Sequence, residues 1–163
     1  ATFSRETNEE DYKKILGKTA EVTEVKKTKK TSQPEGLYDL TDLSRDANQR
    51  FGFSAKQTLN IMQSLYEHHK VLTYPRTDSR YLTTDVAETL RERVEAIAVG
   101  PYRSFTNTVL KGKITPKKSF VNNQKVSDHH AIIPTKVKVN LMSLTIEERN
   151  IYFLFIHNIT KSY

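Results

Sequence analysis

The chain has 163 residues, no cysteine, a formal net charge of +7 and a pI of about 9.5. The lack of cysteine excludes disulfides, thiolate chemistry and Cys-based zinc sites, and it fits a reducing cytoplasm. The length suits one domain with a core and an appendage, and no apolar run is long enough for a membrane span. The positive charge favours a polyanionic partner, and nucleic acid is the first candidate. A lysine-rich protein without such a partner would have the same net charge.

The first 36 residues differ in pattern from the rest. Residues 4–16 predict a short helix that ends at Gly17. The Thr-, Val- and Lys-rich stretch 19–36 predicts a half-exposed strand. Its lysines would either contact phosphate or protect a sheet edge from pairing. Pro34 and Gly36 mark a boundary.

From residue 37 onward the apolar residues follow helical spacing. Five segments predict helices, and they cover residues 41–52, 54–70, 83–101, 102–112 and 145–160. Thr41, Ser54 and Thr145 stand where N-caps are expected, and Gly52 stands where a helix would end. We therefore predict a mainly α fold, a compact multi-helix domain over 37–163 with a small β appendage from a neighbouring domain over 1–36. Because the chain starts at Ala1 and stops inside a helical pattern, we expect a piece of a longer protein.

The segment "TYPRTDSR", residues 73–80, places a tyrosine close to an arginine and an aspartate. In an extended chain Tyr74, Arg76 and Asp78 project to the same side. A tyrosine hydroxyl, with an ordinary pKa near ~10, is a poor nucleophile without help. Arg76 would neutralise a phosphate and stabilise the charge added during attack, and Asp78 would orient Arg76 or share a proton. The competing interpretation is a packed tyrosine before an ordinary turn.

The stretch "LYDLTDLSRDANQRFGFSAKQTLNIMQSLYEHHKVLTYPRTDSRYL", followed later by "SDHHAIIPT", resembles the tyrosine-bearing domain of type IA DNA topoisomerases. The resemblance covers about residues 37–135. "DHHAIIPT" is more similar to the topoisomerase III branch, because in the topoisomerase I branch an acidic residue usually follows the histidine.

The resemblance implies a role for each motif residue. Tyr74 is expected to be the nucleophile that forms a 5′-phosphotyrosyl bond with single-stranded DNA, and Arg76 to position the scissile phosphate. His129 is expected to contact the same phosphate, against the alternative of a packed histidine before a turn, and His130 to matter less. Arg80 is expected to bind DNA with Arg76 and His129. Orienting roles are expected for Thr77, Asp78 and Ser79.

The resemblance also implies groups outside this chain. The family pairs this domain with a Toprim domain that binds Mg²⁺ and supplies an acid–base carboxylate and a lysine. No Asp-x-Asp arrangement here would replace that cluster. We therefore expect no metal site in the chain and no DNA relaxation by the chain alone. Residues 1–36 would belong to the hinge domain and 37–163 to the movable gate of a cytoplasmic, nucleoid-associated bacterial enzyme with no membrane contact.

Two rival functions compete with this one. A non-catalytic basic helical DNA-binding module explains the charge but not the two motifs together. Tyrosine recombinases need a His-x-x-Arg box and relaxases a His-hydrophobe-His motif, and neither occurs in the sequence.

Overall fold

The computed structural model describes residues 13–14, 16–18, 25–28, 36–112, 114 and 118–161. Residues 1–32 and 33–163 form two separate units. The expected helix over 4–16 and the expected strand within 19–36 lie mostly outside the described residues. The predicted boundary at residue 36 therefore stays a prediction, and the second unit carries the rest of the description.

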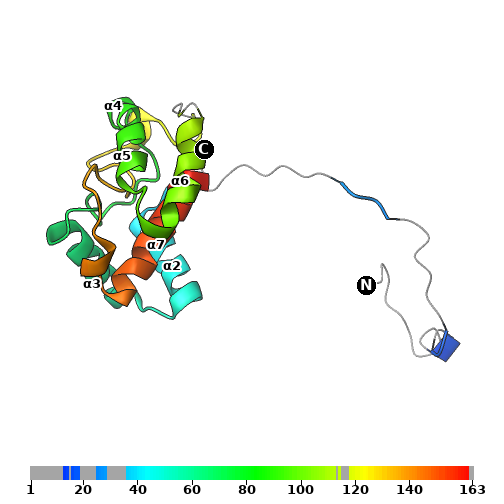
Figure 1. The fold of residues 1–163 in the computed structure, drawn as a ribbon. Helices are drawn as coiled ribbons and strands as arrows, with labels where there is room; N and C mark the ends of the chain where they lie inside the picture. The colour runs from blue at the N-terminus through cyan, green and yellow to red at the C-terminus, as the bar shows by residue number, and fades with distance from the viewer. Residues whose placement is uncertain are drawn as a thin grey trace. The chain divides into compact units, whose positions relative to one another are not determined.

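The second unit is helical (Figure 1). Its α-helices are α2 (Leu40–Phe51), α3 (Ala55–Glu67), α4 (Thr84–Glu88), α5 (Leu90–Ala96), α6 (Arg103–Lys111) and α7 (Ile146–Lys161). Single 3₁₀ turns are η1 (Gly100–Tyr102), η2 (Asn123–Lys125) and η3 (Leu141–Ser143). Within the described ranges β structure is limited to isolated bridges, which join Tyr38 to Ile132, Leu72 to Pro134 and Leu82 to Val121. The prediction of a mainly α fold is confirmed.

The helix ends follow the expected caps except at α2. Asp39, not Thr41, is the N-cap, and its carboxylate accepts a hydrogen bond of 2.7 Å from the Asp42 amide. The predicted cap was wrong because the helix starts earlier, where the Leu40 amide is held by the Thr77 carbonyl at 3.1 Å. Gly52 ends the helix with φ 72°, a conformation that favours glycine.

The predicted single helix over 83–101 is broken. α4 ends at Glu88 and α5 begins at Leu90, with Thr89 between them. The Thr89 hydroxyl donates to the Val86 carbonyl at 2.7 Å and accepts from Arg93 Nε at 2.8 Å. Threonine hydroxyls compete for backbone groups in this way and disfavour regular helix.

α7 lies at the centre of the unit and packs against α3 and α6 (Figure 1). The predicted apolar face is buried, and further residues of the helix are buried as well; together they are Ile151, Tyr152, Leu154, Phe155, Ile156 and Ile159. A helix buried on more than one stripe has neighbours on several sides. The Tyr38 ring meets Phe155 edge-on at 5.6 Å, which ties the segment before α2 to this core.

The N-terminus of α7 is joined to the end of α3 through Glu148. Thr145 and Glu148 form the predicted capping box, with reciprocal hydrogen bonds of 2.8 and 3.2 Å. The Ser64 hydroxyl donates to Glu148 at 2.6 Å, and His69 Nε2 lies 3.4 Å from the same oxygen. Burial by itself raises the pKa of Glu148, but the hydrogen bonds from Ser64 and the Thr145 amide, with His69 nearby, outweigh it and lower the pKa.

We expect Glu148→Gln to lower the free energy of unfolding by about 1–3 kcal/mol, because hydrogen bonds to a charged group contribute in that range. Since the folded pKa is depressed, the stabilising contribution is present above the unfolded value near ~4.3 and is lost as pH falls through the folded value. Urea denaturation between neutral and acid pH measures both effects. The matched control is the exposed neighbour in Glu147→Gln, and an equal loss in both variants would contradict the prediction.

Candidate active site around Tyr74

The two sequence motifs, far apart in the chain, lie side by side. The segment that follows α3 pairs with residues 129–135 through hydrogen bonds from Thr73 N to Ile133 O (3.0 Å) and from Thr135 N to Val71 O (2.9 Å). The Ile133 amide also donates to Thr73 Oγ1 at 3.0 Å. "TYPRTDS" and "DHHAIIPT" therefore border one another.

Burial alternates along the tyrosine segment. Pro75, Thr77 and Ser79 are buried, whereas Arg76 and Asp78 are exposed and Tyr74 is partly buried. This is the alternation of an extended chain, and it places Tyr74, Arg76 and Asp78 on the outer side as expected. Among the residues that the structure describes, none forms an ion pair with Arg76. Its guanidinium is therefore available to a ligand.

The buried hydroxyls of the segment fasten it to the chain around His129. Thr77 Oγ1 donates to the His129 carbonyl at 3.0 Å and accepts from the Ser79 amide at 3.1 Å. Ser79 Oγ donates to the Lys125 carbonyl at 3.2 Å and accepts from the Tyr81 amide at 3.2 Å. Thr77 and Ser79 thus lie where an orienting role requires, although this role stays a prediction.

Tyr74 lies between two aromatic rings. Its centroid is 4.3 Å from that of the exposed His129 at a tilt of 36°. Tyr66, from α3, meets it edge-on at 5.7 Å and 82°. Tyr66 and His129 both pack against the Tyr74 ring, and of these two His129 is exposed to solvent. The structure brings the predicted nucleophile and the predicted phosphate-contacting histidine together.

Tyr74 borders a pocket of about 300 Å³ whose walls come from α4 and the loop before residue 131. Its lining is Tyr74, Thr83, Asp85, Val86, Val126, Ser127, Asp128, His129 and His130. His130 was expected to matter less than His129, yet both line this pocket. The sequence signal was the His-His pair itself, but the sequence does not reveal that both rings reach one pocket.

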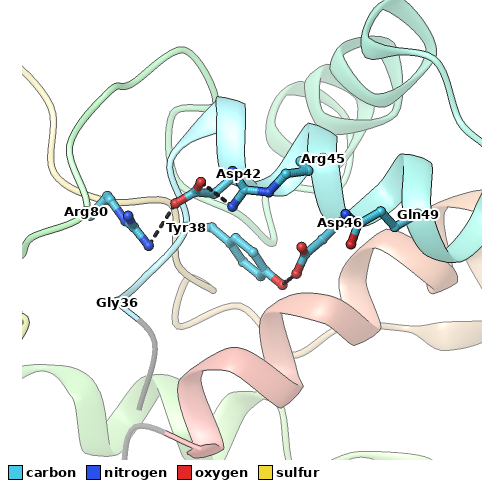
Figure 2. A pocket seen from close by; sticks show the side chains of 7 residues that line it. All are labelled: Gly36, Tyr38, Asp42, Arg45, Asp46, Gln49 and Arg80. Atoms are coloured by element: carbon cyan, nitrogen blue, oxygen red, sulfur yellow. Dashed lines mark hydrogen bonds and ion pairs between the residues drawn. The ribbon is translucent and has the colours of Figure 1, made fainter. Parts of the chain in front are cut away.

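Arg80, expected to bind DNA, borders a different pocket (Figure 2). Figure 2 shows the guanidinium groups of Arg80 and Arg45 reaching the same carboxylate, that of Asp42, at 2.8 and 2.6 Å. The Tyr38 hydroxyl donates to Asp46 at 2.5 Å on the same side of α2. A carboxylate shared with Arg45 therefore offsets part of the charge of Arg80, whereas Arg76 has no such partner among the described residues, and DNA binding by Arg80 stays a prediction.

The described residues offer Mg²⁺ no ligand set. No group of three or more His, Asp or Glu side chains converges among them. Mg²⁺ prefers convergent oxygen ligands, and the pocket beside Tyr74 supplies only Asp85 and Asp128 together with histidines. The described residues therefore do not fit Mg²⁺.

In the part of the chain that the structure describes, no helix has the length and apolar character needed to cross a membrane.

Comparison with known proteins agrees with the geometry. Bacillus cereus DNA topoisomerase 3 is 55% identical over 155 residues, which is 95% of this chain and 21% of the relative. The Bacillus thuringiensis and Bacillus subtilis proteins of the same name are 54% and 50% identical, over 95% and 94% of the chain and 21% of each relative. The chain thus spans about a fifth of the length of these relatives. The family model described as DNA topoisomerase matches residues 1–163, so the chain belongs to the DNA topoisomerase family.

Proposed function

We propose that the chain is the tyrosine-bearing part of an enzyme that cleaves and rejoins single-stranded DNA through a 5′-phosphotyrosyl intermediate. The observation that supports it most is the position of Tyr74, on the outer side of an extended segment with Arg76 and 4.3 Å, centroid to centroid, from His129. In this arrangement the Tyr74 hydroxyl as nucleophile, the Arg76 guanidinium as fixed positive charge and the His129 ring as a second nitrogen donor would face one phosphate.

The reaction exchanges one phosphodiester for another. Tyr74 Oη bonds to phosphorus, the bond from phosphorus to the 3′ oxygen breaks, and a 3′-hydroxyl is released. Reversal restores the strand without an external energy source, because the number of phosphodiester bonds is unchanged. A phenol is a stronger acid than an alcohol, so the tyrosine oxygen is a good leaving group when the 3′-hydroxyl attacks during rejoining.

The roles of the surrounding residues follow from their exposure. Arg76 is exposed and free of carboxylate partners among the described residues, so its planar fork would bind the phosphate oxygens. His129 would donate one hydrogen bond to the same phosphate. Thr77, Asp78 and Ser79 would orient the segment, and Arg80, beside its Asp42 pair, would meet DNA further from the cleaved bond.

The complete reaction needs parts that this chain does not contain. The relatives are about five times longer and are named DNA topoisomerase 3. We place the Mg²⁺ ligands and the acid–base carboxylate in a Toprim domain elsewhere in the full-length protein. The present chain would be the gate that carries the 5′ end away while another strand passes, in the bacterial cytoplasm.

A non-catalytic DNA-binding module is the alternative. It would account for the charge of +7, but it gives no reason for a partly buried tyrosine packed against an exposed histidine at the edge of a pocket. An assay for DNA cleavage distinguishes the two functions directly, because a non-catalytic module would bind DNA without cutting it.

In the full-length protein, Tyr74→Phe is expected to abolish cleavage of a single-stranded oligonucleotide, because the nucleophilic oxygen is removed while the ring and its packing remain. The measurement is a denaturing gel that detects protein attached to the 5′ end of the broken strand. Tyr102→Phe removes a hydroxyl from a ring outside the pocket and should cleave normally. Covalent product from the Tyr74→Phe variant would contradict the proposal.

Arg76→Ala is expected to slow single-turnover cleavage by about 10²–10³-fold, the usual effect of removing one donor to a developing negative charge. Arg76→Lys should recover part of the rate, since the charge returns without the bidentate fork. Arg91→Ala, an exposed arginine paired with Glu95 on α5, is the matched control. A loss of DNA affinity with an unchanged cleavage rate would assign Arg76 to binding alone.

Thr77→Val keeps the shape of the buried side chain and removes its hydrogen bond to the His129 carbonyl. We expect cleavage to fall by up to ~10²-fold, because small misplacements of reacting groups have effects of that size. Oligonucleotide affinity, measured in parallel, should change less than the rate. Thr106→Val is the control, since its hydroxyl bonds only to carbonyls in and just before its own helix. Equal cleavage by the two variants would refute the orienting role.

A further inference from the structure

His130 differs from His129 in its surroundings. His129 is exposed, whereas His130 is partly buried at the same pocket. His130 Nδ1 lies 2.7 Å from the Ala131 carbonyl oxygen. A carbonyl only accepts hydrogen bonds, so Nδ1 carries a proton, and in the neutral ring Nε2 is left as a proton acceptor.

The charges around His130 favour this neutral form. Burial is the main cause that lowers the pKa of His130, and the positive charges of Arg93 on α5 and of His129 act in the same direction. The Ala131 carbonyl and the carboxylate of Asp85 on α4 act against it. Asp128 and Tyr74 are the other titratable groups of the pocket. Near neutral pH the ring is therefore neutral and ready to accept a proton.

We infer that His130 is the general base that takes the proton from the Tyr74 hydroxyl when this attacks DNA, a role that rests on the function proposed above. The proton passes to Nε2 directly or through one water in the pocket that both side chains line. As the bond from Tyr74 Oη to phosphorus forms, the bond to the 3′ oxygen breaks, and the acid–base carboxylate that we place outside this chain would protonate that leaving oxygen. During rejoining the His130 imidazolium returns its proton to the departing tyrosine oxygen.

The geometry suits His129 to contact with the phosphate and His130 to acceptance of the proton. His129 lies against the Tyr74 ring on the exposed side, where a DNA phosphate would arrive. His130 cannot turn freely, since Nδ1 is held by the backbone of the next residue. Its other nitrogen is thereby kept in one orientation, as in sites where a second partner fixes the tautomer of a catalytic histidine.

The test compares full-length variants in single-turnover cleavage of a single-stranded oligonucleotide across pH 5 to 9. His130→Asn places an amide donor near the position of Nδ1, so the bond to the Ala131 carbonyl can persist while the base is lost. We expect its rate at neutral pH to fall by about 10²–10⁴-fold, the usual contribution of general acid–base catalysis. In the wild-type protein the rate should decline as pH falls through the His130 pKa, because protonation removes the acceptor. That acid limb should be absent in the variant.

Chemical rescue separates a base from a merely structural residue. Added imidazole should restore part of the rate of His130→Ala, and substituted imidazoles should do so in order of basicity. His157→Asn, a histidine outside the pocket, is the matched control and should keep the wild-type rate and profile. Unchanged oligonucleotide affinity and circular dichroism would show that the variants are folded.

The outcomes distinguish the two proposals. If Tyr74 forms the covalent intermediate but His130→Asn keeps the wild-type rate and acid limb, the inference about His130 is wrong and the proposed function stands. A slow variant that retains the acid limb and is not rescued by imidazole would also overturn it, since His130 would then act only through packing. If Tyr74→Phe still yields covalent product, both proposals fall.

Discussion

The backbone pairing between residues 71–73 and 133–135 is the constraint on which the site depends. The hydrogen bonds of Thr73 and Val71 to Ile133 and Thr135 join segments separated by about 60 positions. Together with the hydrogen bond from Thr77 to the His129 carbonyl, this pairing holds Tyr74 and His129 beside one another. Short bridges of this kind need a scaffold to hold them, because an isolated pair of short strands is marginal in water. The helices provide that scaffold, with α7 at its centre and α3 leading directly into the tyrosine segment.

Arg76 and Arg80, the two exposed arginines of the motif, differ in how freely their guanidinium groups can bind a ligand. Arg80 shares the Asp42 carboxylate with Arg45, so its charge is only partly compensated within the protein. Arg76 has no such carboxylate among the described residues. A ligand phosphate at Arg76 gains the full attraction of the guanidinium, whereas one at Arg80 competes with Asp42. The arrangement favours one phosphate position, at the tyrosine, over a uniform basic surface.

The sequence allowed much of the fold to be predicted, for reasons visible in single residues. The Thr145–Glu148 capping box and Gly52 are local signals, and both appear as expected. The break at Thr89 was missed, because the apolar spacing of Val86 and Leu90 continues across it, with Val86 packed against the core and Leu90 buried. The Asp39 cap was missed because the start of α2 is set by a distant partner, the Thr77 carbonyl.

The candidate site was predictable in part for the same physical reason. The alternation from Tyr74 to Ser79 is a local property of an extended chain, so the shared side of Tyr74 and Arg76 followed from spacing. The 4.3 Å approach of His129 depends on pairing across the chain, and only the family resemblance connected the two motifs beforehand. The environment of His130 depends on α4 and α5 as well, through Asp85 and Arg93, and no local pattern encodes it.

The reversible cleavage proposed above would place a particular demand on this architecture. If Tyr74 held the 5′ end, the same oxygen would have to return to the same geometry for rejoining, or the break would persist. The segment that carries Tyr74 has no regular helix or sheet to stiffen it. Buried hydroxyls replace them, since Thr77 and Ser79 bind the backbone at His129 and Lys125 as well as their own segment. Buried hydrogen bonds are costly to break singly because each leaves an unpaired group. These hydrogen bonds tie the segment of Tyr74 to the backbone at His129, so the tyrosine and the histidine beside it are held in a fixed relation to one another.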